Sequence, residues 1–197
     1  MKKAIPLILI LCFILSSCSL PQENTQIEID KTEYRKAIWI AYYELSEMTN
    51  GKDKYEFEKT IKEEFSKIAS KGFNTVTVQV RPCADAFYKS AYFPTSRYFN
   101  GEQGSEMNYD PLEIICSYAQ QFDLKIEAWI NPYRVSQDDD YSKLSPNNFA
   151  VKNKKMTKVV DGKIYFNPAY DEVTNLIVSG VKELVAVSYT HLTLPTT

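Results

Sequence analysis

Acidic side chains are the groups in this chain best suited to acid–base chemistry. The only histidine, His191, lies in a C-terminal run of unusual composition; without it no imidazole is left for a nucleophile pair or a histidine-based zinc site. A pair of carboxyl groups flanking a glycosidic bond is how most glycosidases work. Asp85 and Glu127 are the carboxylates whose positions best fit such a catalytic role.

Glu127 belongs to a segment with the alternation of a β-strand, residues 125–134. One row is apolar and the other is polar and aromatic: Ile126, Ala128 and Ile130 against Glu127, Trp129 and Asn131. Because a buried parallel strand is normally a continuous apolar run, this polar row indicates side chains that face a site. An ordinary strand, in which Glu127 pairs with a neighbouring lysine or arginine, remains equally open.

A second segment, residues 74–81, repeats this alternation. Its polar row is Thr75, Thr77, Gln79 and Arg81, its apolar row is Val76, Val78 and Val80, and both segments are followed by proline. We therefore expect two neighbouring strands of one curved parallel sheet. Five side chains are expected to converge at one mouth of that sheet: Gln79, Arg81, Glu127, Trp129 and Asn131.

Asp85 opens a long connection that runs from Cys83 to Tyr109, directly after the second strand. Loops of this length in a compact domain are usually functional or disordered. This loop carries six aromatic residues, Phe87, Tyr88, Tyr92, Phe93, Tyr98 and Phe99. We expect a platform for sugar rings, because pockets mix apolar walls with a few polar groups. The alternative is that the aromatic rings only fold the loop onto the sheet.

The remaining candidates are substrate-binding residues near the strand ends. An arginine fork can clamp a carboxylate, an indole can stack under a sugar, and amides can bond ring hydroxyls. The predicted set is Gln79, Arg81, Tyr88, Trp129, Asn131, Tyr133 and Arg134. Each residue alone is more often part of core packing, so the prediction depends on their being together.

The elements that must position these residues alternate between strand and helix. Beside the two strands above, we expect a strand at residues 35–45, helices at 55–71, 110–122 and 171–185, and a hairpin at 157–166 turning at Asp161–Gly162. The order β-α-β-α-β-hairpin-α predicts an α/β fold with a parallel sheet.

Four motifs in this order carry a family resemblance. They are Gln79–Pro82, Asp85–Ser90, Tyr109–Leu112 and Ala128–Arg134. Together they resemble the glycosyl-hydrolase-like 10 family of bacterial cell-surface proteins, over residues 35–185. Cys83 departs from the small residue expected after the Arg-Pro pair, which leaves the geometry of that loop open.

The resemblance implies a partial TIM-type (β/α) barrel, with only the first three βα units. It also implies a glycoside hydrolase acting on peptidoglycan or another extracellular glycan, in which Asp85 or Glu127 supplies one carboxylate and a lost C-terminal part the other. Because a whole barrel takes about 250 residues, we expect this chain to be inactive alone. We expect no cofactor and no metal. The alternative is a non-catalytic glycan- or solute-binding lipoprotein.

Both ends of the chain differ from the central domain, residues 35–186. Residues 1–17 have the charged and apolar regions of a signal peptide, and their last residues with Cys18 resemble a lipoprotein signal. We therefore expect an exported protein, lipid-anchored to the membrane through Cys18 and a polar tether at 18–34; an ordinary secretory signal is the alternative. Residues 187–197 are interpreted as a non-native tail.

Charge and cysteine content exclude some classes of function. The net charge is −2, and it becomes −4 without residues 1–17, which hold two lysines and no acid. This balance gives no indication of a nucleic-acid partner. Cys83 and Cys116 are too few for a cysteine-only metal cage. Whether they form a disulfide or stay free thiols is left open.

Overall fold

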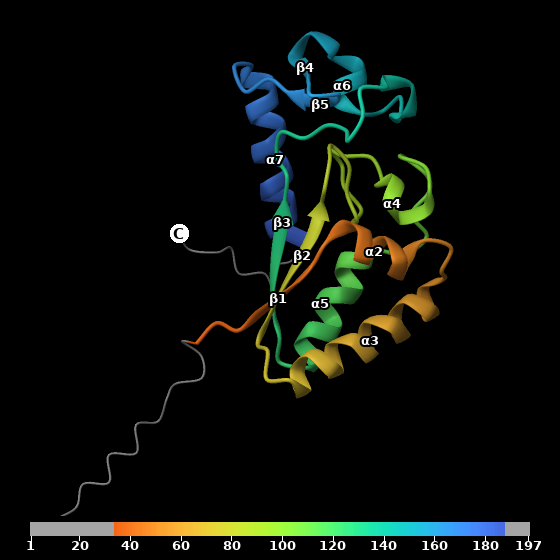
Figure 1. Cartoon of the computed structure of the whole chain (residues 1–197), viewed down its shortest axis with the longest axis vertical. Coiled ribbons are helices and arrows are strands. Elements are labelled where there is room, and N and C mark those ends of the chain that lie inside the picture. Colours follow the sequence, from red (N-terminus) through yellow and green to blue (C-terminus); the bar gives the residue numbers. More distant parts are fainter. Residues whose placement is uncertain (1–33, 188–197) are drawn as a thin grey trace, which may run out of the picture. The chain divides into compact units, whose positions relative to one another are not determined.

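The computed structural model describes residues 34–187, so the predicted signal peptide, Cys18, most of the tether and the tail from residue 188 onward lie outside the described residues. Its centre is a parallel sheet with the strand order β1-β2-β3 (Figure 1). The strands are β1 (Ala37–Ile40), β2 (Thr75–Arg81) and β3 (Lys125–Ile130). The prediction of an α/β fold with a parallel sheet is therefore confirmed.

Two long helices, α3 (Lys54–Ser70) and α5 (Pro111–Gln121), connect these strands and lie together on one side of the sheet (Figure 1). They form one buried core with the apolar row of β2. That core includes Phe57, Ile61 and Phe65 of α3, Leu112, Ile115 and Ala119 of α5, and Val76, Val78 and Val80 of β2. Full burial of such a side chain contributes about 1.5–3 kcal/mol. The apolar row thus determines which face of the sheet is left for the polar row.

Both helices begin at an aspartate that caps the first turn. The Asp53 carboxylate accepts a hydrogen bond from the Glu56 amide at 2.8 Å, and Asp110 does the same for the Leu112 amide at 2.9 Å. Pro111 occupies the first turn of α5, where its missing N–H has no partner to lose. These local signals are why the two helices begin within one residue of the predicted positions.

The predicted first strand, residues 35–45, is wrong in its second half. Strand β1 ends at Ile40, and the helix α2 (Tyr42–Thr49) follows at once. The Ala41 amide donates to the Glu44 carboxylate at 2.7 Å, which closes the first turn of α2. The aromatic and apolar run hid this cap, because a short apolar run does not distinguish strand from helix.

The chain after β3 forms a small lobe beyond the C-terminal ends of the strands (Figure 1). It contains the predicted hairpin, β4 (Thr157–Val160) and β5 (Lys163–Phe166), turning through Asp161 and Gly162, which both have positive φ. The segment 133–135 adds to β5, because the Phe166 amide bonds the Tyr133 carbonyl at 2.8 Å. The lobe also contains η1 (Tyr141–Lys143), α6 (Phe149–Lys152) and η2 (Lys154–Met156). One more short helix, α4 (Arg97–Asn100), belongs to the loop between β2 and α5.

The last described helix, α7 (Asp171–Val187), packs against the C-terminal end of β2 at Gly180. A Cβ on Gly180 would lie 2.4 Å from the Phe93 ring and 2.7 Å from an Arg81 nitrogen. The Glu183 carboxylate, one turn further, accepts a hydrogen bond from the Ala91 amide at 2.6 Å. These contacts join α7 to the long loop after β2.

Two further observations concern membranes and cysteines. Within residues 34–187, no helix combines the length and apolar character that crossing a bilayer requires. Cys83 and Cys116 are both buried free thiols, so the structure contains no disulfide between them. Burial raises the pKa of the Cys116 thiol to about 11, which keeps it protonated and unreactive.

We predict that Gly180→Ala destabilises the protein by about 1–2 kcal/mol, even though alanine is the better helix former. The reason is that the Phe93 ring and the Arg81 guanidinium, which would meet the new methyl group, are both buried and stacked on each other. Urea unfolding measures the change. Asn175→Ala on the exposed side of the same helix is the control, and equal stability of both variants would contradict the packing described.

Candidate functional site

Thr77 and Gln79 of β2 and Glu127 and Trp129 of β3 lie on the face of the sheet opposite α3 and α5. A bulge after Gln79 pairs Arg81 with Ile130 of the apolar row, so the predicted place of Arg81 in this polar row is wrong. Parallel pairing places Trp39 beside Thr77, Thr77 beside Glu127, and Gln79 beside Trp129. Paired residues of neighbouring strands project from the same face of a sheet. The predicted neighbourhood of Gln79, Glu127 and Trp129 on one face is therefore present.

Two indoles lie in contact on this face. The ring centroids of Trp39 and Trp129 are 5.2 Å apart with an interplanar angle of 59°. Trp39 is 61% exposed and Trp129 is partly buried, on a face that a sheet of three strands leaves uncovered. Together the rings make an open aromatic surface near the C-terminal ends of β1 and β3.

Asn131 holds one of these rings in place. Its amide oxygen accepts a hydrogen bond from the Trp129 indole at 3.1 Å, and its amide nitrogen donates to the Pro82 carbonyl at 3.0 Å. Its backbone N–H also bonds the Arg81 carbonyl at 2.8 Å. Asn131 thus connects the ends of β2 and β3 and fixes the orientation of Trp129.

Gln79 is buried at the same level of the sheet. Its side-chain oxygen accepts a hydrogen bond from the Tyr42 amide at 3.2 Å. Tyr42 is the first residue of α2, so Gln79 attaches the start of that helix to the sheet. Gln79 therefore positions α2 at the register level of Trp129.

Glu127 lies lower on the sheet and is held by an ion pair. Arg35 Nε donates to one carboxylate oxygen at 2.8 Å and Arg35 Nη2 to the other at 2.5 Å, while Thr77 Oγ1 donates at 2.7 Å. The hydrogen bonds from Arg35, ahead of that from Thr77, lower the pKa of Glu127 against the opposing effect of burial. The structure therefore contains the arginine pairing that the sequence left open.

The position of this ion pair bears on its function. Arg35 precedes β1, so the pair lies toward the N-terminal ends of the strands. Barrel enzymes keep their reacting groups at the C-terminal ends, and polar groups at the opposite end serve stability. The catalytic assignment of Glu127 stays a prediction, and the geometry favours a structural role.

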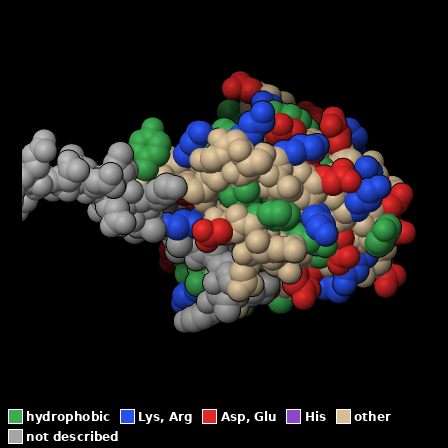
Figure 2. All heavy atoms as spheres, turned by 90° about the horizontal axis from the view of Figure 1, so that it is seen from below, with side chains coloured by type: hydrophobic (Ala, Val, Ile, Leu, Met, Phe, Trp, Pro, Cys, Tyr) green, Lys and Arg blue, Asp and Glu red, His purple; other side chains and the backbone are tan. Residues whose placement is uncertain are grey.

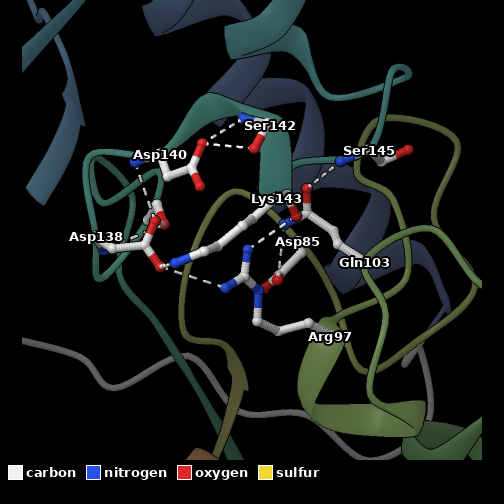
Figure 3. Close-up of polar contacts among 9 residues, drawn as sticks. Asp85, Arg97, Gln103, Asp138, Asp140, Ser142, Lys143 and Ser145 are labelled. Atoms are coloured by element: carbon white, nitrogen blue, oxygen red, sulfur yellow. Dashed lines mark hydrogen bonds and ion pairs between the residues drawn. The ribbon is translucent and has the colours of Figure 1, made fainter.

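Asp85 is 1% exposed and lies in a buried polar network that joins two loops. Gln103 Nε2 donates to the Asp85 carboxylate at 3.0 Å (Figure 3). The Gln103 oxygen accepts from the Ser145 amide and from Asn148 Nδ2, each at 3.0 Å, and Asn148 also donates to the Ala84 carbonyl. The network thus fastens the loop after β2 to the loop after β3.

Burial raises the pKa of Asp85, while the hydrogen bond from Gln103 opposes this shift. A general acid needs a raised pKa, but it must also reach the proton it transfers. No solvent path to Asp85 is open in the described structure. Its predicted catalytic role therefore stays untested, and its contacts are those of a residue that organises loops.

Beside this network, a second cluster ties the same two loops at the surface (Figure 3). Asp138 faces Lys143 at 3.3 Å and Arg97 at 3.6 Å, and Arg97 also donates to the Lys143 carbonyl at 2.9 Å. Asp140 accepts hydrogen bonds from Ser142. Asp138 and Asp140 therefore both have partners within this cluster.

Arg81 and Tyr88 are buried rather than open to a ligand. The Arg81 guanidinium stacks on the Phe93 ring with its carbon 3.7 Å from the ring centroid. Desolvation lowers the pKa of Arg81, and burial raises the pKa of Tyr88 to about 12. The two side chains form a core beneath the loop, so they do not line the indole surface.

Four of the six loop aromatics, Phe87, Tyr88, Phe93 and Phe99, are buried, as expected if they fold the loop onto the sheet. Tyr92 is 45% exposed and belongs to a cleft of about 720 Å³ between this loop and the α6 region. Other residues of the cleft include Lys89, Ser90, Asn147 and Lys152. The aromatic platform expected on the loop is therefore largely core.

Tyr133 and Arg134, the last two predicted binding residues, lie in the lobe after β3. Tyr133 is 40% exposed, and Arg134 forms an antiparallel backbone bridge with Tyr165 of β5. Within residues 34–187 there is no cluster of three or more His, Cys, Asp or Glu residues able to hold a metal ion. The binding residues thus separate into a sheet group and a lobe group.

Trp39 is a candidate that sequence reasoning missed, because it stood inside an apolar run. The available signal was its alternation with Ile38 and Ile40, which puts the indole on the opposite face from two core residues. Pairing of β1 with β2 then brings it to the polar face. A lone aromatic residue out of phase with its apolar neighbours was therefore informative.

We predict that Gln103→Ala lowers the free energy of unfolding by about 2–4 kcal/mol, because it leaves the Asp85 carboxylate, the Ser145 amide and one Asn148 hydrogen bond without a partner. Chemical denaturation measures this loss. Gln120→Ala, at an exposed position of α5, is the matched control. A Gln103 variant as stable as the control would show that the network does not hold the loops.

We predict that Glu127→Gln destabilises the protein at neutral pH and that the difference from wild type shrinks in acid. Because the pKa of Glu127 in the folded state lies below its unfolded value of 4.5, the ionised carboxylate stabilises the folded state at pH values above 4.5. This stabilisation is lost as the pH falls through the folded-state pKa. Urea midpoints at pH 7 and pH 3 test it, with Glu102→Gln on the surface as control. A difference independent of pH would refute the ion-pair account.

Comparison with known proteins places this geometry in context. A model of the glycosyl hydrolase-like 10 family matches residues 34–190. The glycosyl hydrolase YngK of Bacillus subtilis is 35% identical over 157 residues, 76% of this chain and 30% of that protein. DigH, a glycosyl hydrolase of Escherichia coli K12, is 32% identical over 124 residues, 58% of this chain and 28% of that protein. The chain therefore spans less than a third of either relative.

Among solved structures, the α-amylase of Geobacillus thermoleovorans superposes with a TM-score of 0.50 at 10% identity, over 79% of this chain and 38% of that one. At this identity the likeness concerns the fold alone, a TIM-type barrel. Since the family match spans residues 34–190 of the 197, well over half of the chain, this protein belongs to the glycosyl hydrolase-like 10 family, and its sheet and helices are the first βα units of a TIM-type barrel.

Proposed function

We propose that this chain forms the N-terminal part of a cell-surface glycoside hydrolase that acts on peptidoglycan or another extracellular glycan. Lipidation of Cys18 would anchor that protein to the membrane. The family supports a glycosidase-like role. The observation that carries the proposal is the contact between Trp39, which is exposed, and Trp129, which is partly buried, each one residue before the C-terminal end of its strand.

The indole pair suits a sugar ring for a physical reason. Sugar rings have apolar C–H faces edged by hydroxyls, and a large rigid aromatic side chain buries such a face at little entropic cost. Asn131 holds Trp129 in one orientation, so the surface is formed before a ligand binds. Peptidoglycan and other extracellular glycans offer rows of such rings.

The catalytic carboxylates require a separate argument. Glu127 is kept ionised by Arg35, and Asp85 is buried against Gln103, so each is already bonded to protein groups. Paired-carboxylate hydrolysis needs two acids facing the glycosidic bond. We assign Glu127 and Asp85 to positioning the sheet and the loops, and we place the reacting acids on barrel strands of the whole protein outside this chain.

A non-catalytic glycan-binding protein is the second candidate. One observation favours it: in the described residues, the carboxylate nearest to the indoles in the strand register, Glu127, is occupied by Arg35 and Thr77. Stacking on Trp39 and Trp129 alone would then account for the site. The two candidates differ in whether new reducing ends are released from the glycan.

We predict that Trp39→Ala and Trp129→Ala each weaken binding of the protein to purified peptidoglycan about tenfold, the effect of losing about 1.4 kcal/mol at an aromatic anchor. Cosedimentation measures the affinity. Tyr55→Ala is the control, because Tyr55 is 73% exposed on α3, behind the sheet. Unchanged binding of both tryptophan variants would remove the proposed site.

A reducing-end assay on the same samples separates the candidates. The whole protein, with its complete barrel, is expected to release reducing ends, whereas the 197-residue chain alone is expected to bind without release. Binding by the whole protein with no release of reducing ends would favour the non-catalytic alternative.

A further inference from the structure

Positive charge is concentrated in the lobe after β3. Residues 152–163 include one acid, Asp161, and five lysines, Lys152, Lys154, Lys155, Lys158 and Lys163, although the whole chain has a net charge of −2. None of these lysines makes an ion pair within the described part of the chain. A local excess of unpaired like charge raises the electrostatic energy unless counter-charge is bound.

The hairpin register places part of this charge on one surface. Lys158 of β4 lies opposite Tyr165 of β5, and Tyr165 in turn pairs with Arg134. Val160 lies opposite Lys163, two residues further along the same face. Because paired residues share a face, one surface carries three cations around an aromatic ring. We call it the cationic platform: Arg134, Lys158, Lys163 and Tyr165.

The cations of the platform lack protein partners. Arg134 Nε is buried without a hydrogen-bond acceptor among the described residues. Two acids at the rim already have partners, since Asp138 is bound by Lys143 and Arg97, and Asp140 by Ser142. A buried guanidinium nitrogen without an acceptor is costly, which an anionic ligand would relieve.

This distribution differs from that on the opposite end of the molecule. Figure 2, seen from below, shows lysines and arginines interspersed with aspartates and glutamates, as on an ordinary solvated surface. The lobe lies at the other end, beyond the C-terminal ends of the strands (Figure 1). The mixed charge at that end contrasts with the lysine-rich segment 152–163 of the lobe.

The platform also has the composition of a polysaccharide site. Tyr165 provides a partly exposed ring between cations, and Tyr133, 40% exposed, precedes Arg134. Lys152, from the same lobe, lines the cleft of about 720 Å³ beside the loop after β2. Ring faces alternating with charges match a polymer of sugars that carries regularly spaced anions.

We propose that the cationic platform binds an anionic polysaccharide through its carboxylate or phosphate groups. The choice of a polysaccharide over other polyanions rests on the proposed function. The platform acts separately from the Trp39–Trp129 surface, because it lies on other elements and needs no hydrolysis.

The experiment measures binding of the full chain by affinity electrophoresis at low and at 0.15 M salt. Polygalacturonate tests carboxylates, its methyl-esterified form supplies the same backbone without charge, and teichoic acid tests phosphates. We expect the protein to bind a charged polymer and not the esterified one. Lys158→Glu combined with Lys163→Glu is expected to weaken this binding about tenfold, and added salt to weaken it further.

The control reverses the same number of charges elsewhere, Lys59→Glu with Lys62→Glu, at exposed positions of α3. Its binding is expected to equal that of wild type. Equal losses in both double variants would reduce the effect to net charge and overturn the proposal, as would equal binding of esterified and free polygalacturonate. Binding only to vesicles of anionic lipid would show a membrane surface instead. Failure of the whole protein to release reducing ends from peptidoglycan, with polygalacturonate binding by this chain retained, would refute the proposed hydrolase function alone.

Discussion

The two-faced packing of the central sheet is the constraint on which the rest of the structure depends. The valines of β2 are buried against α3 and α5, and this leaves Thr77 and Gln79 on the other face. Side chains alternate between the two faces of a strand, so Thr77 and Gln79 cannot change sides without exposing a core valine, and the alternation is interrupted only at the bulge before Arg81. This packing places three features on the polar face, namely the indole pair, the Glu127 ion pair and the contact of Gln79 with α2.

The loops depend on a different interaction, the satisfaction of buried polar groups. Asp85, Gln103 and Asn148 are nearly inaccessible. Gln103 bonds Asp85 within the loop after β2, and it bonds Asn148 and the Ser145 amide of the loop after β3. Such a network specifies one arrangement, because any displacement leaves a polar atom unpaired in a low-dielectric interior. The lobe after β3 is thereby held at a fixed position over the strand ends. A rigid scaffold of this kind is what a barrel needs to present binding groups.

The two proposed binding surfaces differ in the same way, since one is aromatic and the other is positively charged. The sheet face offers exposed aromatic area beside Asn131, which suits uncharged ring surfaces. The lobe offers unpaired positive charge around Tyr165, which suits anions. Membership in a glycosyl hydrolase-like family unites them, since a glycan polymer has both apolar ring faces and, in many envelopes, acidic substituents. The two surfaces would then recognise different features of one polymer.

By itself, the sequence determined the alternation of strands and long helices, the helix start at Asp110, the Asp161–Gly162 turn, and the polar rows of β2 as far as Gln79 and of β3. These are local properties, set by caps, glycine and alternation. Only the tertiary structure decided that Arg35 neutralises Glu127, that Gln103 covers Asp85, and that Trp39 meets Trp129. Those partners are between 18 and 92 residues apart along the chain, and no local pattern reports which side chains a fold brings together.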